Sequence, residues 1–523
     1  MTGSAQSDSA TAGCREASLK KLRSMPSAEQ RAFAMADAAT EQRRMHDVRP
    51  PDWRNPSPAP SYDLVVLGAG TAGLVAAKMA AARGKKVAIV ERHLLGGTCL
   101  NIGCLPSKTI IRTSRAYGDM RDGARFGAEV PRDVTVDFPA AMRRVRRIRA
   151  RVSQFDSASG LAAAGIDTFF GDGRFVGTDA LAVNGATLRF ARAVIATGAR
   201  PSSPNIPGLA EAGYITNESA FDLTEAPRRL LVIGGGPLGC EMAQAFCRLG
   251  VETTIVQNWP LFLPREERDA AQLLSDSFAR DGIRIRLDTN VVSVRVVGGE
   301  TLVDLVHDDY RNTIAVDAIL AGVGRTPNVG DFDLEAAGVV YDESRGVHVD
   351  DFLCTDNPCI FAAGDVCLEH KFNATAEASA RIAVENALFS EHRRLSELVI
   401  PWCTYTDPEI AHVGMYVREA REQGISVKTF TIPLHEVDRA IADGEEAGFV
   451  KIHVRERTDQ ILGATIVASH AGEMISELTL AMVAGVGLST LANVIHPYPT
   501  QAAAIRRAAE AYELTQGPSP TLG

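Results

Sequence analysis

The sequence predicts an α/β protein with two doubly wound parallel-sheet domains and a smaller α+β domain toward the C-terminal end. Two stretches predict the doubly wound domains, because each reads as an apolar strand, a glycine-rich turn, a small-residue helix and a second strand. These stretches begin with YDLVVLGAGTAGL and RRLLVIGGGPLGC. From about residue 400 the glycine turns stop, and the strand-like stretches GFVKIHVRE and ILGATIVAS precede two helix-like stretches near residues 473–484 and 501–514. This change of pattern predicts a separate domain.

The composition is that of a multidomain globular protein. Of 523 residues, 46% are hydrophobic and 23% are charged, and no apolar run approaches the roughly 20 residues that span a bilayer. The formal net charge of -9 shows no basic stripe, which argues against nucleic acid as a partner. The nine cysteines follow no disulfide framework, and the first sixty residues show no signal-peptide pattern. We therefore expect a reducing, cytoplasmic setting.

The first sixty residues precede the two α/β units and have a different composition. They are rich in Ala, Ser, Arg and Glu, and one helix is predicted near residues 28–45. The stretch RPPDWRNPSPAPS follows, and its prolines are typical of a stiff, extended linker. The first globular domain is predicted to begin at Tyr62.

The first glycine turn has the pattern GxGxxG at Gly68, Gly70 and Gly73, directly after an apolar strand. The first glycine permits a tight turn, the second lets the backbone approach a pyrophosphate, and the third lets the helix pack on the strand. Glu91 ends the next strand, where a carboxylate can accept hydrogen bonds from ribose hydroxyls. This unit is predicted to bind a dinucleotide.

A second GxGxxG turn repeats the pattern at Gly234, Gly236 and Gly239. The strand after it ends in Gln257, so the ribose-binding acid is missing. Without that carboxylate a 2′-phosphate is not repelled, and Arg265 and Arg268 follow a short way downstream. NADP(H) is therefore favoured modestly over NAD(H), although arginines that only solvate a loop are an equally good interpretation.

Two cysteines follow the first turn in the stretch GGTCLNIGCLPSK, with four residues between them. A zinc site would need a second Cys or His pair downstream, and none follows, so no metal site is predicted. Two dinucleotide sites imply electron transfer, which favours Cys99 and Cys104 as a redox pair with a thiolate stabilised at a helix N-terminus. The other cysteines that lie among apolar neighbours are predicted to be small core residues: Cys240, Cys247, Cys354, Cys359, Cys367 and Cys403.

Together these motifs resemble the class I pyridine nucleotide-disulfide oxidoreductases, the family of glutathione reductase, dihydrolipoyl dehydrogenase and mercuric reductase. The resemblance also rests on the segments ATGARP, GVGRTPN, IFAAGDV and TYTDPEIAHVG, and it covers about residues 62–512. It implies FAD and NADPH or NADH as cofactors, and a homodimer whose active site is completed by the partner chain. The implied division is an N-terminal extension 1–60, an FAD-binding domain 61–200 resumed at 331–398, an NAD(P)H-binding domain 201–330, a dimerisation domain 399–515 and a tail 516–523.

The resemblance also implies roles for individual residues. It makes Cys99 the interchange thiol and Cys104 the thiol in charge-transfer contact with FAD, with Lys108 paired to Glu241 beside the flavin. On the residues alone, Lys108 and Glu241 could equally be an ordinary surface pair. Asp365 would hold the ribityl chain. Further positions placed against the cofactors are Gly97, Thr98, Thr197, Gly198 and Gly364 for FAD, and Gly324 for NAD(P)H.

The C-terminal motif departs from that of the family's disulfide reductases. They carry HxHPTxxE, in which the second His, oriented by the Glu, is the acid–base group. Here the stretch HPYPTQAA puts Tyr498 in place of that His and Ala503 in place of the Glu. A phenol with a pKa of about 10 is a poor base at neutral pH. His496 could serve as a base instead, and Tyr498 could be only a packed interface aromatic.

A tyrosine at this position resembles mercuric reductase, as does Tyr214 in GYITNES. Three departures argue against true mercuric reductase activity: LTQGPSPTLG lacks vicinal cysteines, Cys14 has no partner cysteine, and Ala374 stands where many relatives have His.

We therefore predict an enzyme, an FAD-dependent NAD(P)H oxidoreductase that passes electrons through a Cys99–Cys104 disulfide to a thiol-linked or soft-metal acceptor. Two alternatives stay open. One is a conventional reductase of a low-molecular-weight disulfide, of the glutathione reductase or dihydrolipoyl dehydrogenase type. The other, of a different class, is a slow-turnover flavin redox sensor.

Overall fold

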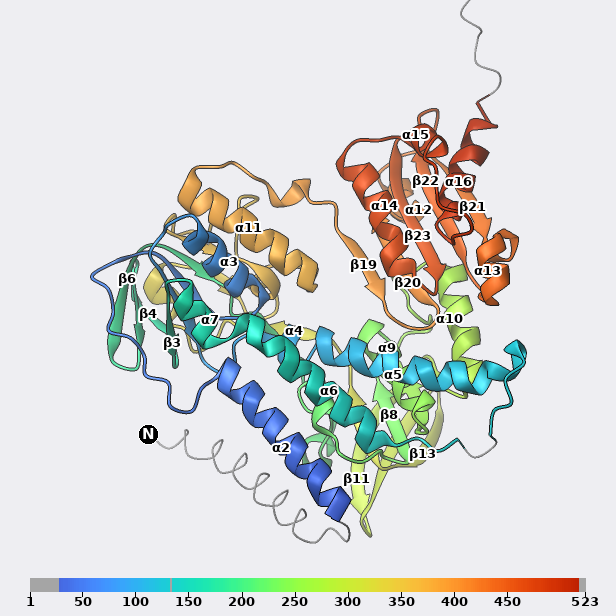
Figure 1. The fold of residues 1–523 in the computed structure, drawn as a ribbon, viewed down its shortest axis with the longest axis horizontal. Helices are drawn as coiled ribbons and strands as arrows, with labels where there is room; N and C mark the ends of the chain where they lie inside the picture. The colour runs from blue at the N-terminus through green and yellow to red at the C-terminus, as the bar shows by residue number, and fades with distance from the viewer. Residues whose placement is uncertain (1–27, 132–133, 517–523) are drawn as a thin grey trace, which may run out of the picture.

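The computed structural model describes residues 28–131 and 134–516 of the chain. Figure 1 shows three domains: one at the left built from early and late segments, one below and to the right, and a C-terminal domain at the upper right. This arrangement confirms two doubly wound domains and a C-terminal α+β domain.

A seven-stranded sheet forms the centre of the first domain. Its strands are β1 (Tyr62–Leu67), β2 (Val87–Glu91), β3 (Ile166–Phe170), β4 (Arg174–Gly177), β5 (Ala180–Val183), β6 (Ala186–Ile195) and β18 (Ile360–Ala362). They lie in the order β3-β2-β1-β6-β5-β4, and β18 also pairs with β6. The parallel strands β1 and β2 are buried on both faces, which explains why their sequences are continuous apolar runs. The chain thus returns to this sheet after the second domain.

Helices cover this sheet and extend from it toward the second domain. They are α3 (Thr71–Ala82), α4 (Gly97–Asn101), α5 (Cys104–Asp122), α6 (Phe138–Ser153), α7 (Ala158–Ala163) and α11 (Asn373–Phe389). In Figure 1, α3 and α11 lie side by side. Their buried side chains are mostly alanines, which lets two helices approach closely on one sheet face.

The second domain has a parallel four-stranded sheet in the order β10-β9-β8-β14. The bounds of these strands are β8 (Arg229–Ile233), β9 (Glu252–Val256), β10 (Arg284–Arg286) and β14 (Ala318–Ala321). Its helices are α8 (Leu209–Ala212), α9 (Pro237–Arg248) and α10 (Arg268–Asp281), and its antiparallel sheet comprises β11 (Asn290–Val297), β12 (Glu300–His307) and β13 (Tyr310–Val316).

The chain leaves the first domain and returns to it through one antiparallel pair, β7 (Ala199–Pro201) with β15 (Arg325–Pro327). A short hairpin, β16 (Tyr341–Asp342) with β17 (Gly346–Val347), follows the return.

The C-terminal domain is a five-stranded antiparallel sheet covered by helices. The strand order is β19 (Pro401–Thr404), β20 (Glu409–Gly414), β23 (Ile461–Ala468), β22 (Phe449–Arg455) and β21 (Val427–Pro433). The helices are α12 (Val417–Glu422), α13 (Asp438–Asp443), α14 (Ala471–Val483), α15 (Leu488–Ala492) and α16 (Ala503–Glu513). α14 and α16 confirm the two predicted helical stretches, whereas α12, α13 and α15 are short and carried no clear sequence pattern.

The N-terminal extension contains the predicted helix as α2 (Ala28–Val48). The proline-rich stretch after it is extended, but it is docked on the first domain rather than free of it. The side chain of Asn55 donates to the carbonyl of Phe170 and accepts from its N–H, at 3.0 and 2.9 Å. These bonds cover the exposed edge of β3, because an edge strand otherwise leaves backbone groups unpaired.

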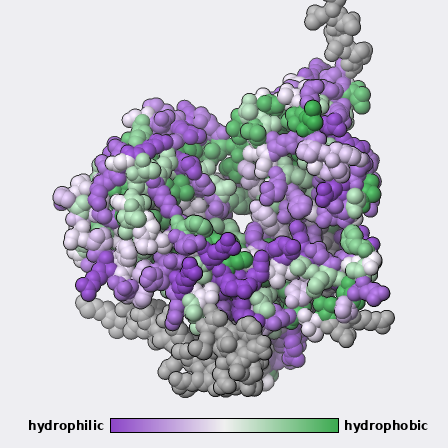
Figure 2. All heavy atoms as spheres, viewed as in Figure 1, coloured by the Kyte–Doolittle hydropathy of each residue, from purple (hydrophilic) through white to green (hydrophobic). Residues whose placement is uncertain are grey.

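The C-terminal domain carries exposed apolar side chains. On the face of the molecule drawn in Figure 2 they gather near α14. Leu480 and Val483 of α14, and Ile495, are 68%, 65% and 93% exposed. Exposed apolar patches of this kind mark protein interaction sites. Among residues 28–131 and 134–516, no helix has both the length and the apolar character needed to cross a membrane.

Candidate active site

The first glycine turn brings the cysteine segment against the start of α3. Gly68 has a φ of +103°, and a Cβ there would lie 2.3 Å from the carbonyl oxygen of Ala196. A Cβ at Gly73 would lie 1.8 Å from the oxygen of Gly68, so the helix packs on the strand as predicted. At Gly70 only the Cα of Gly97 comes within 4 Å. The backbone beside the helix N-terminus is therefore open to an anionic ligand.

Gly97 belongs to the same cradle. A Cβ at this residue would lie 2.6 Å from the Cα of Gly70, and its φ is +54°. Only glycine tolerates this approach without a shift of the backbone. The redox segment and the dinucleotide turn are thereby held against each other.

Glu91 lies at the end of β2, where its carboxylate caps the glycine turn. It accepts hydrogen bonds from the N–H groups of Ala69 and His93, at 2.7 and 2.6 Å. Burial raises the pKa of this carboxyl. It also lines a cavity of about 1040 Å³, whose wall includes Gly68, Thr197 and Arg325.

Arg325 is a site residue that sequence analysis missed, although the segment GVGRTPN contains it. Its Nη1 lies 2.8 Å from Asp365, whose pKa is raised by burial, and its Nη2 donates to Thr98 Oγ1 at 3.4 Å. Its Nε is buried without a partner. An unsatisfied guanidinium N–H beside the open turn fits a phosphate-bearing ligand such as the FAD that the resemblance implies.

Of the remaining residues assigned to the first cofactor, Thr197 lines this cavity. Thr197 Oγ1 donates to the carbonyl of Asn328 at 2.7 Å, and Gly198 accepts from the N–H of Asn328 at 2.9 Å. Gly364 has a φ of +79°, and a Cβ there would lie 3.0 Å from the Cβ of Ala72 at the start of α3. These residues come from two segments that are far apart in the sequence.

Cys99 and Cys104 lie on consecutive helices. Cys99 is in α4 and half-buried, whereas Cys104 is the first residue of α5 and exposed. Both are free thiols. Cys99, as a hydrogen-bond donor, and the charge of Lys108 lower the pKa of Cys104 to about 6. The same hydrogen bond, and burial, raise the pKa of Cys99. The predicted thiolate at a helix N-terminus is thus Cys104.

Lys108 and Glu241 form an ion pair between α5 and α9, at 2.9 Å. Glu241 is 4% exposed, so the pair is not the surface pair that residues alone allowed. Burial lowers the pKa of Lys108, but the attraction of Glu241 outweighs it and the net shift is upward. The ammonium group is therefore held charged close to Cys104.

Tyr405 completes this cluster from the C-terminal domain. Its N–H donates to Glu241 at 3.0 Å, and the Lys108 ammonium lies 4.5 Å from the centre of its ring. Sequence analysis quoted the segment TYTDPEIAHVG without assigning Tyr405 a role, because only the fold brings it to α5 and α9.

The expectation that six further cysteines are core residues is correct only in part. Cys240 is fully buried, but the other five are half-buried. Cys403 differs most, because it lies beside Glu241 and Lys108, and burial and the carboxylate of Glu409 raise its pKa. Its strand, β19, joins the C-terminal domain to this cluster, which its apolar neighbours in sequence did not reveal.

The second glycine turn has the geometry predicted from its sequence. Gly234 has a φ of +104°, and a Cβ there would lie 2.5 Å from the oxygen of Gly322. A Cβ at Gly239 would lie 2.0 Å from the oxygen of Gly234, whereas Gly236 has nothing within 4 Å. Gly324, with a φ of +110°, follows β14 where the chain leaves this domain.

The residues expected to favour a 2′-phosphate are partly engaged elsewhere. Gln257 is 7% exposed and donates through Nε2 to the carbonyl of Leu261 at 2.6 Å. Arg268 donates to the carbonyls of Phe262 and Glu266, at 2.9 and 2.8 Å. Its guanidinium therefore closes its own loop, which corrects its assignment as a candidate phosphate ligand. Arg265 is exposed.

Within one chain, the structure places Tyr498 on the C-terminal domain and not with the cysteine pair. Tyr498 is 80% exposed and donates to Asp438 Oδ2 at 2.9 Å, which raises the pKa of the phenol. His496 Nε2 lies 3.0 Å from Glu477, and its Nδ1 lies 3.2 Å from the carbonyl of Val494. Both ring nitrogens of His496 thus have partners in the chain, so it fits a satisfied structural residue better than a free base.

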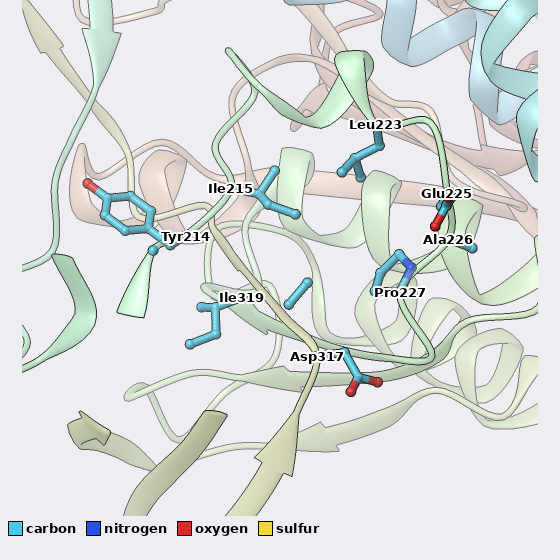
Figure 3. A pocket seen from close by; sticks show the side chains of 10 residues that line it. Tyr214, Ile215, Leu223, Glu225, Ala226, Pro227, Asp317 and Ile319 are labelled. Carbon is cyan, nitrogen blue, oxygen red and sulfur yellow. The ribbon is translucent and has the colours of Figure 1, made fainter. Parts of the chain in front are cut away.

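Tyr214 lies at the connection between the first two domains. Its hydroxyl donates to Ser203 Oγ at 3.1 Å. The residue lines a pocket of about 360 Å³ together with Ile215, Ile319 and Asp317, and its ring points away from the other side chains of that pocket (Figure 3). Tyr214 is therefore not part of the Lys108–Glu241 cluster.

Comparison with known proteins gives a consistent relationship. The family model for pyridine nucleotide-disulphide oxidoreductases matches residues 62–387, and the model for the dimerisation domain of that family matches residues 400–509. Mercuric reductase of Staphylococcus aureus is 33% identical over 452 residues, which cover 86% of this chain and 82% of that protein. Dihydrolipoyl dehydrogenase of Thermus scotoductus is 33% identical over 462 residues, covering 86% and 97%.

Solved structures agree with this relationship. The HOCl-induced flavoprotein disulfide reductase RclA from Escherichia coli, in its Cu(II) complex, is 28% identical with a TM-score of 0.78, covering 87% of this chain and 100% of that one. LpdA from Mycobacterium tuberculosis is 27% identical with a TM-score of 0.78, covering 86% and 99%. The chain therefore belongs to the pyridine nucleotide-disulphide oxidoreductase family: it is an NAD(P)H-dependent flavoprotein disulfide oxidoreductase with FAD as its second cofactor and a homodimerisation domain.

Proposed function

We propose that this enzyme passes electrons to a thiol-linked or soft-metal acceptor that binds at the thiolates of Cys99 and Cys104. Because the stretch LTQGPSPTLG lacks vicinal cysteines, thiol-bound Hg(II) and copper ions represent this class of acceptor and do not identify it. The proposal is carried by the Cys99–Cys104 pair, which lies beside the Lys108–Glu241 ion pair in a chain whose C-terminal motif has lost the usual acid–base dyad. Thiolates prefer soft metals, and reduction of a bound ion needs electrons more than a proton. When bound, the two cofactors supply the electrons.

The chain's own groups account for the charge and the protons of this reaction. Binding of the ion displaces the proton of Cys99, since a metal binds the thiolate and not the thiol. Lys108, held in place by Glu241, lowers the pKa of Cys104 and so favours its deprotonated form. Two electrons per NAD(P)H would balance the reduction of one Hg(II) to Hg(0), or of two Cu(II) to two Cu(I), with NAD(P)⁺ and one proton as the other products.

We assign the proposed cofactor contacts from the cavity and from the two glycine turns. FAD would be held by Gly68, Gly70, Gly73, Glu91, Gly97, Thr98, Thr197, Gly198, Gly364 and Asp365. NAD(P)H would be held by Gly234, Gly236, Gly239, Gln257 and Gly324. We also propose that Tyr498 completes the site of the partner chain, as its 80% exposure within one chain allows, and that the enzyme works in the cytoplasm.

The relatives support a metal acceptor. Several are named mercuric reductases, at 32–34% identity, and the solved structures include Cu(II) complexes of RclA. A second candidate, a conventional disulfide reductase, is favoured by the dihydrolipoyl dehydrogenases among the relatives. Tyr498 and Ala503 weigh against it, because a phenol is a weak acid and alanine has no proton to donate to a leaving thiolate.

An acceptor screen on the purified holoenzyme tests this proposal. We expect NAD(P)H to drive reduction of Cu(II) and of thiol-bound Hg(II), and we expect Cys99→Ser to lose metal reduction while keeping reduction of an artificial dye. Dye reduction serves as the control, because it needs no thiol. Metal reduction that persists in Cys99→Ser would contradict the proposal. A third result is possible: NAD(P)H reduces the flavin rapidly, but no acceptor in the screen is turned over. That result would favour the redox sensor.

Nucleotide preference provides a separate test at Gln257. We expect a modest preference for NADPH in the unmodified enzyme, and a shift toward NADH in Gln257→Glu, because a carboxylate there binds ribose hydroxyls and repels a 2′-phosphate. The measurement is kcat/KM with each nucleotide and a dye as acceptor, with Arg268→Lys as a control that keeps the charge near the loop. A strong preference for NADH in the unmodified enzyme would overturn this expectation.

A further inference from the structure

A helix outside the residues matched by the family models lies against the segment that carries Cys99. The family match begins at residue 62, whereas α2 ends at Val48. Figure 1 shows α2 alongside α6. Asp37 binds Arg146 at 2.7 Å, and Asp47 accepts from Ser153 Oγ at 2.7 Å. Acidic residues on one face of α2 thus dock it on α6.

Arg44 extends from α2 into the redox segment. It is 6% exposed, and its Nη1 donates to Oδ1 of Asn101 at 2.5 Å. Its Nε donates to both carboxylate oxygens of Glu41, at 3.0 and 3.1 Å, which fixes the direction of the guanidinium. Charge-assisted bonds of this kind are stronger than neutral ones. Arg44 therefore holds Asn101 firmly.

Asn101 in turn closes the turn that carries Cys99. It is 3% exposed, and its Nδ2 donates to the carbonyls of Leu95 and Gly97, both at 2.9 Å. Arg149 donates to the Asn101 carbonyl at 3.0 Å. Because α4 has only five residues, it has few backbone hydrogen bonds of its own. The side chain of Asn101, the last residue of α4, therefore ties the C-terminal end of this helix to its first residue and to the residues before it.

We propose that Arg44 is a positioning residue for the redox pair, acting from the N-terminal helix through Asn101 on the turn that carries Cys99. The inference rests on the proposed role of Cys99 and Cys104. Loss of Arg44 would leave Oδ1 of Asn101 buried without a partner, which is costly and favours rotation of the side chain. The turn would then loosen, and the hydrogen bond from Cys99 to Cys104 would weaken.

The two electron routes of the proposed function give the proposal a readout. Metal reduction needs Cys99 in its place beside Cys104, whereas reduction of an artificial dye needs no thiol. The ratio of kcat/KM with thiol-bound Hg(II) to kcat/KM with the dye therefore reports the position of Cys99, because a merely structural loss lowers both values together.

The experiment compares Arg44→Met with Arg146→Met, which removes a contact of α2 with α6 but none with Asn101. We expect the ratio of metal to dye reduction to fall by roughly tenfold or more in Arg44→Met, since a small misplacement of a reacting group is costly. Arg146→Met should leave the ratio unchanged, although both variants lose a contact of α2 and should show a similarly lowered Tm. Arg44→Lys, which keeps one donor, should lie between wild type and Arg44→Met, and it is the variant to use if Arg44→Met does not fold.

Two results would overturn the proposal: an unchanged ratio in Arg44→Met, or an equal fall in Arg146→Met, which would show general loosening of the helix. These failures differ from failure of the proposed function, in which the unmodified enzyme itself would reduce the dye but no metal. The same ratio is then measured with oxidised glutathione, the alternative thiol-dependent acceptor.

Discussion

Cys104→Ser is expected to abolish the long-wavelength band of the two-electron-reduced enzyme, whereas Cys99→Ser is expected to keep it. The reason is that the thiolate resides on Cys104, where a hydrogen bond from Cys99 and the charge of Lys108 stabilise it. A serine at position 99 can still donate that hydrogen bond, but it cannot bind a soft metal. The measurement is an anaerobic titration with NAD(P)H followed by absorption spectroscopy.

The pH dependence of the band checks the same assignment. The pKa of Cys104 is lowered to about 6, so the thiolate predominates above that pH and the band should fade as the pH drops through it. An unperturbed thiol would show the midpoint at about 8.5. Equal loss of the band in both serine variants, or protein purified without flavin, would refute the role given to this cysteine pair.

Oxidised glutathione and lipoamide are expected to be poor substrates, turning over far more slowly than the flavin is reduced. General acid–base assistance contributes about 10² to 10⁴ in rate, and neither Tyr498 nor Ala503 supplies it. The hydrogen bond to Asp438 raises the pKa of Tyr498 still further, which makes the phenol a weaker acid. Stopped-flow measurement of flavin reduction beside steady-state disulfide turnover gives the comparison.

Restoring the dyad should reverse this deficit. We expect Tyr498→His combined with Ala503→Glu to increase disulfide reduction, while Ala503→Glu alone, the matched control, should not. The effect requires that the backbone here follows that of the disulfide reductases in the family. Disulfide turnover by the unmodified enzyme as fast as its flavin reduction would return it to the conventional disulfide reductases.

Some features of this protein were determined by the sequence alone, because they depend on short stretches of chain. The turns at Gly68 and Gly234 need a positive φ and close backbone contact, which only glycine permits, so their spacing after an apolar strand was sufficient. Cys99 and Cys104 were predicted as a redox pair from their place after the first glycine turn, and the structure puts Cys104 at the start of α5. The loss of the dyad at Tyr498 was likewise visible by direct comparison with the family motif.

Other features were decided only by the tertiary structure. Sequence analysis left Lys108 and Glu241 open as a surface pair, but packing of α5 on α9 buries the carboxylate. It offered Arg268 as a phosphate ligand, yet carbonyls of its own loop take up the guanidinium. It gave no role to Arg44, whose partner Asn101 lies 57 residues away in the chain.

The physical reason is the range of the interactions involved. Turn geometry and hydrophobic periodicity are set by neighbouring residues, so they can be recognised in a short window of sequence. The burial of a charge and the choice of its hydrogen-bond partner depend on which distant elements pack together, because an unpaired buried group costs free energy and the fold must supply its partner. The motifs therefore predicted where the redox chemistry lies, and the packing of the three domains decided which side chains surround the two cysteines.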